Sequence, residues 1–195
     1  MRSLFYILSL LLVVFLLGCE DVPTFPTAYA GYFPLSKGST WVYKNSDGSI
    51  DTLVAVEEFD VTTGGKGAFI RGNDSSISMY WRDGNKIYTQ VLKDSLSYQS
   101  TAWLIEESGA TWQYSFKSTS LKSTFSYTGK EMGLTRTVLS KTYQDVFHVH
   151  IVVNDTINGF PGSGTIDEYY AKGIGLIEII DNAGDYGQLV SYTIK

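Results

Sequence analysis

The chain has 195 residues, a net charge of −5 and 44% hydrophobic residues, which is enough apolar material for one folded domain and excludes wholesale disorder. No stretch is rich in lysine and arginine, so we expect no nucleic-acid partner. The chain has one cysteine, which excludes an internal disulfide.

Residues 1–18 have the organisation of an export signal. Arg2 supplies a positive charge, and the run Leu4–Leu17 is apolar except for Ser9. This run is too short for a comfortable membrane span and has the length of a signal-peptide core. A single-pass anchor is the alternative, but the short run and the missing flanking charges weigh against it. We therefore predict a lipoprotein signal helix that is removed from the mature protein.

The signal ends in Leu16-Leu17-Gly18-Cys19, which resembles the lipobox of bacterial lipoproteins. The resemblance implies that the sulfur of Cys19 receives a diacylglyceryl group, that cleavage follows Gly18, and that the new amine is acylated. Two or three acyl chains hold a protein on a membrane far more firmly than one. The alternative is an ordinary secretory signal with a chance cysteine. In lipoprotein sorting, Glu20 in place of the aspartate linked to inner-membrane retention favours the outer membrane of the cell envelope.

Residues 19–31 form the next segment, which contains Pro23, Pro26 and several small residues but no alternating pattern. Such a composition is typical of an extended tether. Beyond it, over residues 32–195, polar and apolar side chains alternate along most of the chain. We therefore expect a lipidated cysteine, a tether and a single β domain, in that order.

The alternation is clearest in three runs, and it predicts strands that bury one face. The apolar members of these runs are Trp112, Tyr114 and Phe116; Phe125 and Tyr127; and Phe147, Val149, Ile151 and Val153. Asp47-Gly48, Asp83-Gly84 and the stretch Asn182–Gly187 each separate two alternating runs and predict hairpins. Gly64-Gly65 and Gly159–Gly164 predict further loops.

About ten or eleven such strands at short spacing predict an all-β fold. No window shows a convincing helical stripe, and Ala102–Glu107 has room for one helical turn at most. A parallel sheet is excluded because the chain has no crossover helices. We expect an antiparallel meander that forms a strongly curved sheet, either a partly open barrel or a two-layer sandwich.

Three stretches resemble a family of uncharacterised bacterial secreted proteins and lipoproteins, the TapB-like group. Tyr32–Tyr43 has the opening pattern Y-F-P-L-x-x-G-x-x-W-x-Y, Lys141–Val153 resembles the central strand, and Tyr169–Ile177 resembles the closing pattern Y-x-A-K-G-x-G-L-V. The resemblance extends to the curved half-barrels of lipoprotein carriers. It implies a curved β fold in the cell envelope and no established activity.

The same motifs have a structural explanation. Gly38 permits a tight turn before the first strand. Trp41 and Tyr43 lie on one face of that strand, which the alternation assigns to the core. Gly173 and Gly175 allow a close backbone approach or a bulge. These residues are therefore expected to stabilise the fold rather than to contact a ligand.

The candidate metal ligands all have simpler explanations. His148 and His150 point to one face of a strand, but no third ligand is evident nearby, so we expect two solvated histidines. The oxygen-rich stretches Asn45–Asp51 and Asp181–Asp185 lack the terminal bidentate acid of a calcium loop and are explained by hairpin turns. The sequence predicts neither a metal site nor a cofactor.

No catalytic signature is present. The chain has no nucleophile elbow, P-loop or dinucleotide fingerprint, and the acid pairs Glu57-Glu58 and Glu106-Glu107 face apart in extended chain. We predict a non-enzymatic, membrane-anchored binding or carrier module for an apolar or glycan ligand. In it, Trp81, Trp103 and Trp112 either line a concave face or lie in the core. The alternative is a structural or assembly lipoprotein that contacts other envelope proteins through its exposed strand edges.

Overall fold

The computed structural model describes residues 31–62, 65–93, 96–97, 101–117 and 121–195. The predicted signal, Cys19 and the tether up to residue 30 lie outside these residues. The described residues contain no helix, and therefore none that could cross a membrane. They form one antiparallel sheet of fourteen strands, so the predicted all-β fold is confirmed.

The strands follow one another along the chain with short connections, as the turn signals predicted. In order they are β1 Thr40–Asn45, β2 Ile50–Asp60, β3 Lys66–Arg71, β4 Ile77–Asp83, β5 Lys86–Lys93, β6 Leu96–Ser97, β7 Thr101–Ile105, β8 Thr111–Lys117, β9 Leu121–Gly129, β10 Leu134–Val138, β11 Lys141–Ile157, β12 Phe160–Ala171, β13 Gly175–Asp181 and β14 Tyr186–Thr193. The strand order in the sheet is β6-β5-β4-β3-β2-β1-β14-β13-β12-β11-β9-β8.

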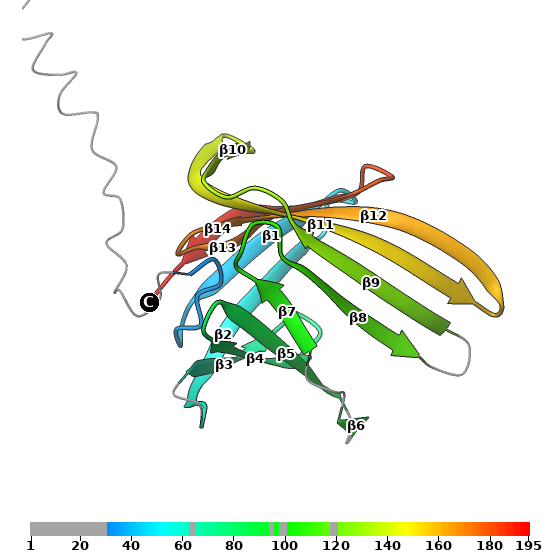
Figure 1. The fold of residues 1–195 in the computed structure, drawn as a ribbon. Helices are drawn as coiled ribbons and strands as arrows, with labels where there is room; N and C mark the ends of the chain where they lie inside the picture. Colours follow the sequence, from blue (N-terminus) through cyan, green and yellow to red (C-terminus); the bar gives the residue numbers. More distant parts are fainter. Residues whose placement is uncertain (1–30, 63–64, 94–95, 98–100, 118–120) are drawn as a thin grey trace, which may run out of the picture.

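The sheet curls into a nearly closed barrel (Figure 1). The first strand of the chain pairs with the last, and most other neighbours in the sheet are consecutive in sequence. Strand β7 pairs with β5 and also contacts β8, so it bridges the seam between the two ends of the sheet. Strand β10 pairs with the first residues of β11, outside the main path. The curved, partly open barrel is thus the correct one of the two predicted architectures.

The three predicted hairpins are confirmed. Asp47-Gly48, Asp83-Gly84 and the stretch 182–185 connect β1 to β2, β4 to β5 and β13 to β14. Ala102–Glu107, for which the sequence allowed one helical turn at most, has none, because residues 102–105 belong to β7. One other prediction was wrong: the Gly159–Gly164 loop is only a tight turn, because Phe160 to Gly164 pair with β11.

The two ends of the barrel differ, because successive hairpin turns of an antiparallel meander lie at alternate ends. Residues 31–36 dock at one end of the barrel, where Tyr32 and Leu35 are buried, and we call this end the plugged end. The turns β4–β5 and β12–β13 lie at this end. The turns β1–β2, β3–β4, β11–β12 and β13–β14 lie at the opposite end, which we call the open end.

The predicted core residues are buried. Trp41 and Tyr43 are 3% and 8% exposed, and the alternate residues of β11 from Phe147 to Ile151 are at most 2% exposed. The indole N–H of Trp41 donates to the carbonyl oxygen of Ile174 at 2.6 Å. Gly175, with φ +109°, lies under this indole, where an added Cβ would come within 3.3 Å of the ring nitrogen. The close approach predicted for the closing motif is therefore confirmed.

Candidate functional site

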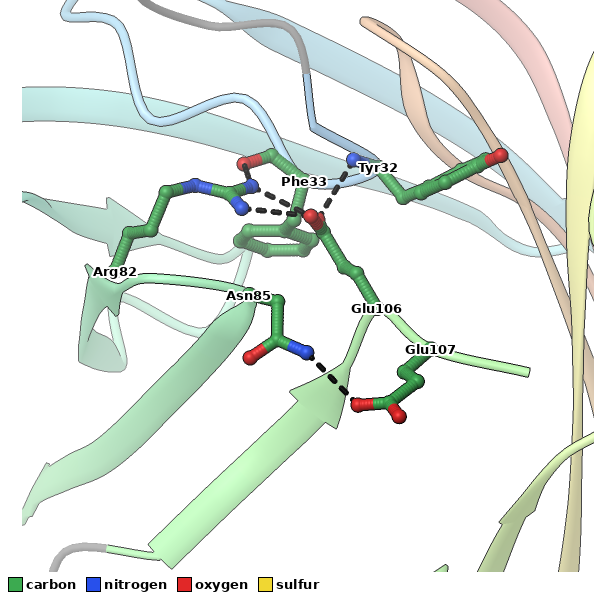
Figure 2. A network of polar contacts seen from close by, with 6 residues as sticks. All are labelled: Tyr32, Phe33, Arg82, Asn85, Glu106 and Glu107. Atoms are coloured by element: carbon green, nitrogen blue, oxygen red, sulfur yellow. Dashed lines mark hydrogen bonds and ion pairs between the residues drawn. The ribbon is translucent and has the colours of Figure 1, made fainter. Parts of the chain in front are cut away.

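A charged network closes the plugged end (Figure 2). The two terminal guanidinium nitrogens of Arg82 donate to the two carboxylate oxygens of Glu106 at 2.7 and 2.8 Å. Glu106 Oε1 also accepts the backbone N–H of Tyr32 at 2.7 Å, and Arg82 donates to the carbonyl oxygen of Phe33 at 3.3 Å. Because the Glu106 side chain is only 9% exposed, this bidentate pair is shielded from water and fixes the point at which the chain enters the barrel.

The acid pair Glu106-Glu107 forms no joint site. Figure 2 shows the two side chains pointing to different partners, and Glu107 Oε2 accepts a hydrogen bond from the side-chain amide of Asn85 at 3.1 Å. The predicted opposite orientation of these neighbours is confirmed. Their roles at the plugged end are structural, since each carboxylate is occupied by a donor of the domain itself.

Glu168 is a buried carboxyl group in the interior of the barrel. Its exposed fraction is 5%, and the hydroxyl of Tyr170 donates to its Oε2 at 2.6 Å. Burial raises the pKa of Glu168 to about 7, although the hydrogen bond from Tyr170 acts in the opposite direction. Tyr43, Tyr80 and Tyr127 lie close enough for the Glu168 charge to raise their pKa values in turn, after the larger effect of burial.

The interior around Glu168 is filled with large side chains. Phe147 and Tyr170 are fully buried, and Trp112 stacks on Tyr127 with ring centroids 5.1 Å apart. Trp103 also packs against this core. Trp103 and Trp112 are thus half-buried at the margin of this core. Around Glu168 the described side chains therefore fill the interior of the barrel.

Three neighbouring hollows lie at the open end. Their volumes are about 500, 460 and 510 Å³, and each shares lining residues with the next. The first and second share Asn45, Ile179 and Gly187, and the second and third share Ile166 and Asp181. Together they form a discontinuous groove that runs from β2 and β3 across β13 to the tip of the β11–β12 hairpin. We call it the open-end groove.

The open-end groove has an apolar floor and a polar rim. The floor consists mainly of aliphatic side chains, and its buried or half-buried members are Tyr43, Leu53, Val153, Ile166, Leu176 and Ile179. The rim consists of aspartate, asparagine and serine side chains from the turns and the adjoining ends of strands. The aspartates are Asp47, Asp51, Asp74, Asp155, Asp181 and Asp185. None of the described lining residues is a lysine, arginine or histidine, so the groove disfavours anions.

Hydrogen bonds hold the rim in place. Ser46 donates its backbone N–H to the carbonyl of Tyr186 at 2.9 Å and its hydroxyl to Asp185 Oδ1 at 2.8 Å, which joins the β1–β2 and β13–β14 turns. Asn73, from the β3–β4 turn, accepts the backbone N–H of Thr52 at 3.0 Å and donates to the carbonyl of Ile50 at 2.7 Å. The rim is therefore largely formed before any ligand arrives, which reduces the entropic cost of binding.

The sequence predicted two solvated histidines, but in the structure both side chains contact the same carboxylate. His148 Nε2 and His150 Nδ1 both contact Oδ1 of Asp167, from β12, at 2.7 and 2.9 Å. Their side chains are 22% and 28% exposed, and His148 stacks on Tyr169. Burial raises the pKa of Asp167, but the hydrogen bonds from both histidines outweigh it and lower the pKa overall. Within the described ranges, no group of three or more histidine, cysteine, aspartate or glutamate side chains is arranged to hold a metal ion.

In the two oxygen-rich stretches, aspartate oxygens accept hydrogen bonds from the backbone of their own turns. Asp47 Oδ1 accepts the backbone N–H of Ser49 at 2.8 Å, and hydrogen bonds from Ser49 lower the Asp47 pKa. Asp181 Oδ1 accepts the backbone N–H groups of Ala183 and Asp185 at 2.8 and 2.9 Å. These are hairpin turns of the predicted kind. The lipidation site Cys19 and the cleavage site Gly18 lie outside the described residues and stay predictions.

Comparison with known proteins supports the fold. No protein-family model matches the chain, and no curated protein sequence matches it. A protein from Parabacteroides distasonis that is classed as a lipoprotein has a similar structure, with a TM-score of 0.57 and 11% identity, over 84% of this chain and 99% of that one. A protein from Bacteroides fragilis that is classed as exported, with a YmcC-like fold, gives a TM-score of 0.52 at the same identity and coverage. The fold is thus one that occurs in envelope proteins of bacteria.

Sequence reasoning did not find the open-end groove. Three of its aspartates come from three different turns and the others from strands, and only the pairing of β1 with β14 brings the first of these turns beside the last. The convergence of Asp167 on the histidines was missed for a similar reason, because it depends on the register in which His150 faces Asp167. The signal that was available was the repeated presence of aspartate and asparagine in the hairpin turns.

Proposed function

We propose that the chain is a non-enzymatic lipoprotein of the bacterial cell envelope that binds a neutral or amine-bearing glycan in the open-end groove. The observation that carries this proposal is the combination of an apolar floor with a preformed rim of carboxylate and amide side chains. Such a lining suits a ligand with many hydroxyl groups and apolar C–H faces, since Asp and Asn bind hydroxyls and the aliphatic floor covers the ring.

The position of the groove supports a role at a membrane surface. The described chain begins at the plugged end, where the carbonyl of Gly31 accepts the backbone N–H of Gly173 at 2.8 Å. A lipid on Cys19 would therefore lie on the tether side, and the groove would face away from it. Twelve tether residues span at most about 40 Å when fully extended. The names of the two similar structures, a lipoprotein and an exported protein, agree with this location.

A glycan is favoured over an acyl chain as the ligand. An acyl chain needs a long dry cavity, whereas the interior of this barrel is filled by buried side chains such as Phe147 and Tyr170. The groove is instead open to solvent and lined by six aspartates. Lipid carriage inside the barrel is thus the less favoured form of the predicted binding module.

The test is binding of the labelled full chain, in mild detergent, to an array of neutral, amine-bearing, sulfated and sialylated oligosaccharides. We expect binding to neutral or amine-bearing sugars and none to the anionic ones, because the rim carries no cation. Asn73→Ala should weaken binding at least tenfold, since this side chain lies on the rim and its hydrogen bonds to the backbone of β2 hold the rim in place. Asn85→Ala, at the plugged end, is the matched control and should bind like the wild type. Absence of glycan binding, or equal loss in both variants, would refute the proposal.

A further inference from the structure

Part of one edge of strand β12 is covered by no other strand of the described chain. It pairs with β11 along its whole length, from Phe160 to Ala171. Its pairing with β13 begins only at Ile166. The stretch Phe160–Gly164 therefore has a partner on one side only, at the tip of the long hairpin that extends from the barrel in Figure 1.

The direction of the unpaired backbone groups in Phe160–Gly164 follows from the hydrogen bonds of Thr165. Both its N–H and its carbonyl bond to Asn182, at 3.1 and 3.0 Å, and therefore point away from β11. Backbone groups alternate along a strand, so the N–H and carbonyl of Ser163 point the same way, as does the carbonyl of Pro161. Pro161 has no N–H to offer. The edge thus presents one donor and two acceptors to an incoming strand.

The surface beside this edge is apolar and acidic. Phe160 and Ile157 are 78% and 54% exposed, and both line a hollow of about 510 Å³. Gly162 leaves this surface open, since an added Cβ there would have no neighbour within 4 Å. Asp155 and Asp181 line the same hollow. In the described part of the chain, Oδ1 of Asp155 is shielded from solvent and has no hydrogen-bond partner.

We propose that the Phe160–Gly164 edge of β12 binds an extended, lysine- or arginine-bearing peptide segment of another protein, which adds to the sheet as an antiparallel or parallel strand. Main-chain hydrogen bonds to Ser163 and Pro161 supply the attachment. The apolar side chains of the peptide contact Phe160, and a cationic side chain reaches Asp155, for which it supplies the missing partner. This goes beyond the proposed glycan site, because it assigns a protein partner to the β12 edge, whose hollow is the third hollow of the open-end groove.

The charge of the hollow selects the partner. The described residues that line it include two aspartates and no cation, so an acidic strand is repelled and a basic one is attracted. A second copy of the chain is a poorer partner, because two copies of this edge in contact would place their aspartates together. Pro161 also shortens the edge, which limits the pairing to a short segment.

The test uses the full chain in mild detergent and a fluorescent hexapeptide of alternating lysine and valine, with a glutamate–valine peptide as control. We expect fluorescence anisotropy to show saturable binding of the lysine peptide only. Ser163→Pro should weaken this binding about tenfold, because it removes the donor that faces the edge. Ser163→Ala, which keeps the N–H, should bind like the wild type, and Asp155→Asn should weaken binding and reduce its salt dependence.

A measurement on the wild type covers the case in which Ser163→Pro does not fold. In NMR hydrogen exchange, the lysine peptide should slow the exchange of the Ser163 amide and leave that of exposed turn amides such as Gly48 unchanged. The proposal is overturned if the lysine peptide does not bind, or if it binds with unchanged exchange at Ser163. Equal binding of the two peptides would refute the charge selection. Loss of glycan binding in an otherwise peptide-competent chain would leave this inference standing, so the two proposals fail separately.

Discussion

Two glutamates of this barrel are buried, and their carboxyl groups have different partners. Glu178, 3% exposed, pairs with Arg136 and accepts a hydrogen bond from Gln188 at 2.6 Å. Glu168, 5% exposed, accepts from a tyrosine hydroxyl and forms no ion pair with a described residue. A buried carboxylate without a cation is costly, so it holds its proton more tightly. The interior of the barrel therefore contains a group that titrates near neutral pH.

Glu168 makes the stability of the domain depend on pH. Its pKa is about 7 in the folded state and 4.5 as the ordinary value, so between these pH values the folded state binds more protons than the unfolded state. The free energy of unfolding should fall as pH rises from 4.5 to 7, by about 3 kcal/mol from this group, and then level off. Urea unfolding at pH 5, 6, 7 and 8 measures this change in the free energy of unfolding.

Glu168→Gln is the matched variant, because glutamine keeps the shape and an acceptor for the Tyr170 hydroxyl. It should remove this part of the pH dependence and should be more stable than the wild type at pH 8. A wild-type stability that rises between pH 5 and 7, with the same rise in Glu168→Gln, would show that other groups dominate and that Glu168 titrates normally.

His148 offers a second measurement on a single residue. His148→Ala removes a contact to Asp167 and a stacked ring, and we expect a loss of about 1 kcal/mol in the free energy of unfolding. A chelator should leave the wild type unchanged in the same urea experiment. If the chelator destabilises the wild type and has no effect on His148→Ala, the histidines bind a metal and our prediction is wrong.

At the scale of the elements, the entry segment and the barrel depend on one ion pair. Arg82→Ala would leave the Glu106 carboxylate shielded with only the Tyr32 N–H as partner, and we expect a loss of about 2–4 kcal/mol. The segment around Phe33 should also become sensitive to limited proteolysis. Lys66→Ala is the control, because its pair with Asp60 is largely exposed and should contribute little. Equal protease resistance of both variants would show that the apolar side chains alone hold the segment.

Local patterns predicted the elements well where they also fixed a face. The alternation in β11 correctly placed Phe147 and its inward neighbours, and Asp-Gly correctly marked two hairpins. The sequence left the structure of Ala102–Glu107 open, because a short apolar run is compatible with both a helical turn and a strand. The pairing of this run with β5 makes it a strand, and pairing with another part of the sequence leaves no local pattern.

At the scale of the whole molecule, the sequence predicted the curved barrel and missed what lies at its two ends. Arg82 and Glu106 are 24 positions apart, and nothing near either residue indicates the other. The same holds for Ser46 and Asp185, which meet at the open end although 139 positions separate them. Such contacts depend on the closure of the sheet and on its register, which no short motif encodes.

The anchor is tested on the whole chain. Cys19→Ser should abolish labelling by an alkyne fatty acid and release the protein from the membrane fraction, because the sequence has no other cysteine to acylate. The wild type, expressed in the same bacterial host, should label and sediment with membranes. Equal labelling and retention of both proteins would refute lipidation at Cys19 and leave the domain anchored by other means or not at all.

The pairing of β1 with β14 also determines when the protein folds. Thr40 pairs with Thr193, so the barrel cannot close until β14 has been synthesised. At about 5–20 residues per second, a chain of 195 residues takes roughly 10–40 s to emerge. During that time β1 has only half of its hydrogen-bonding partners, and Trp41 lacks the carbonyl of Ile174. Closure of the barrel is thereby postponed until β14 has emerged.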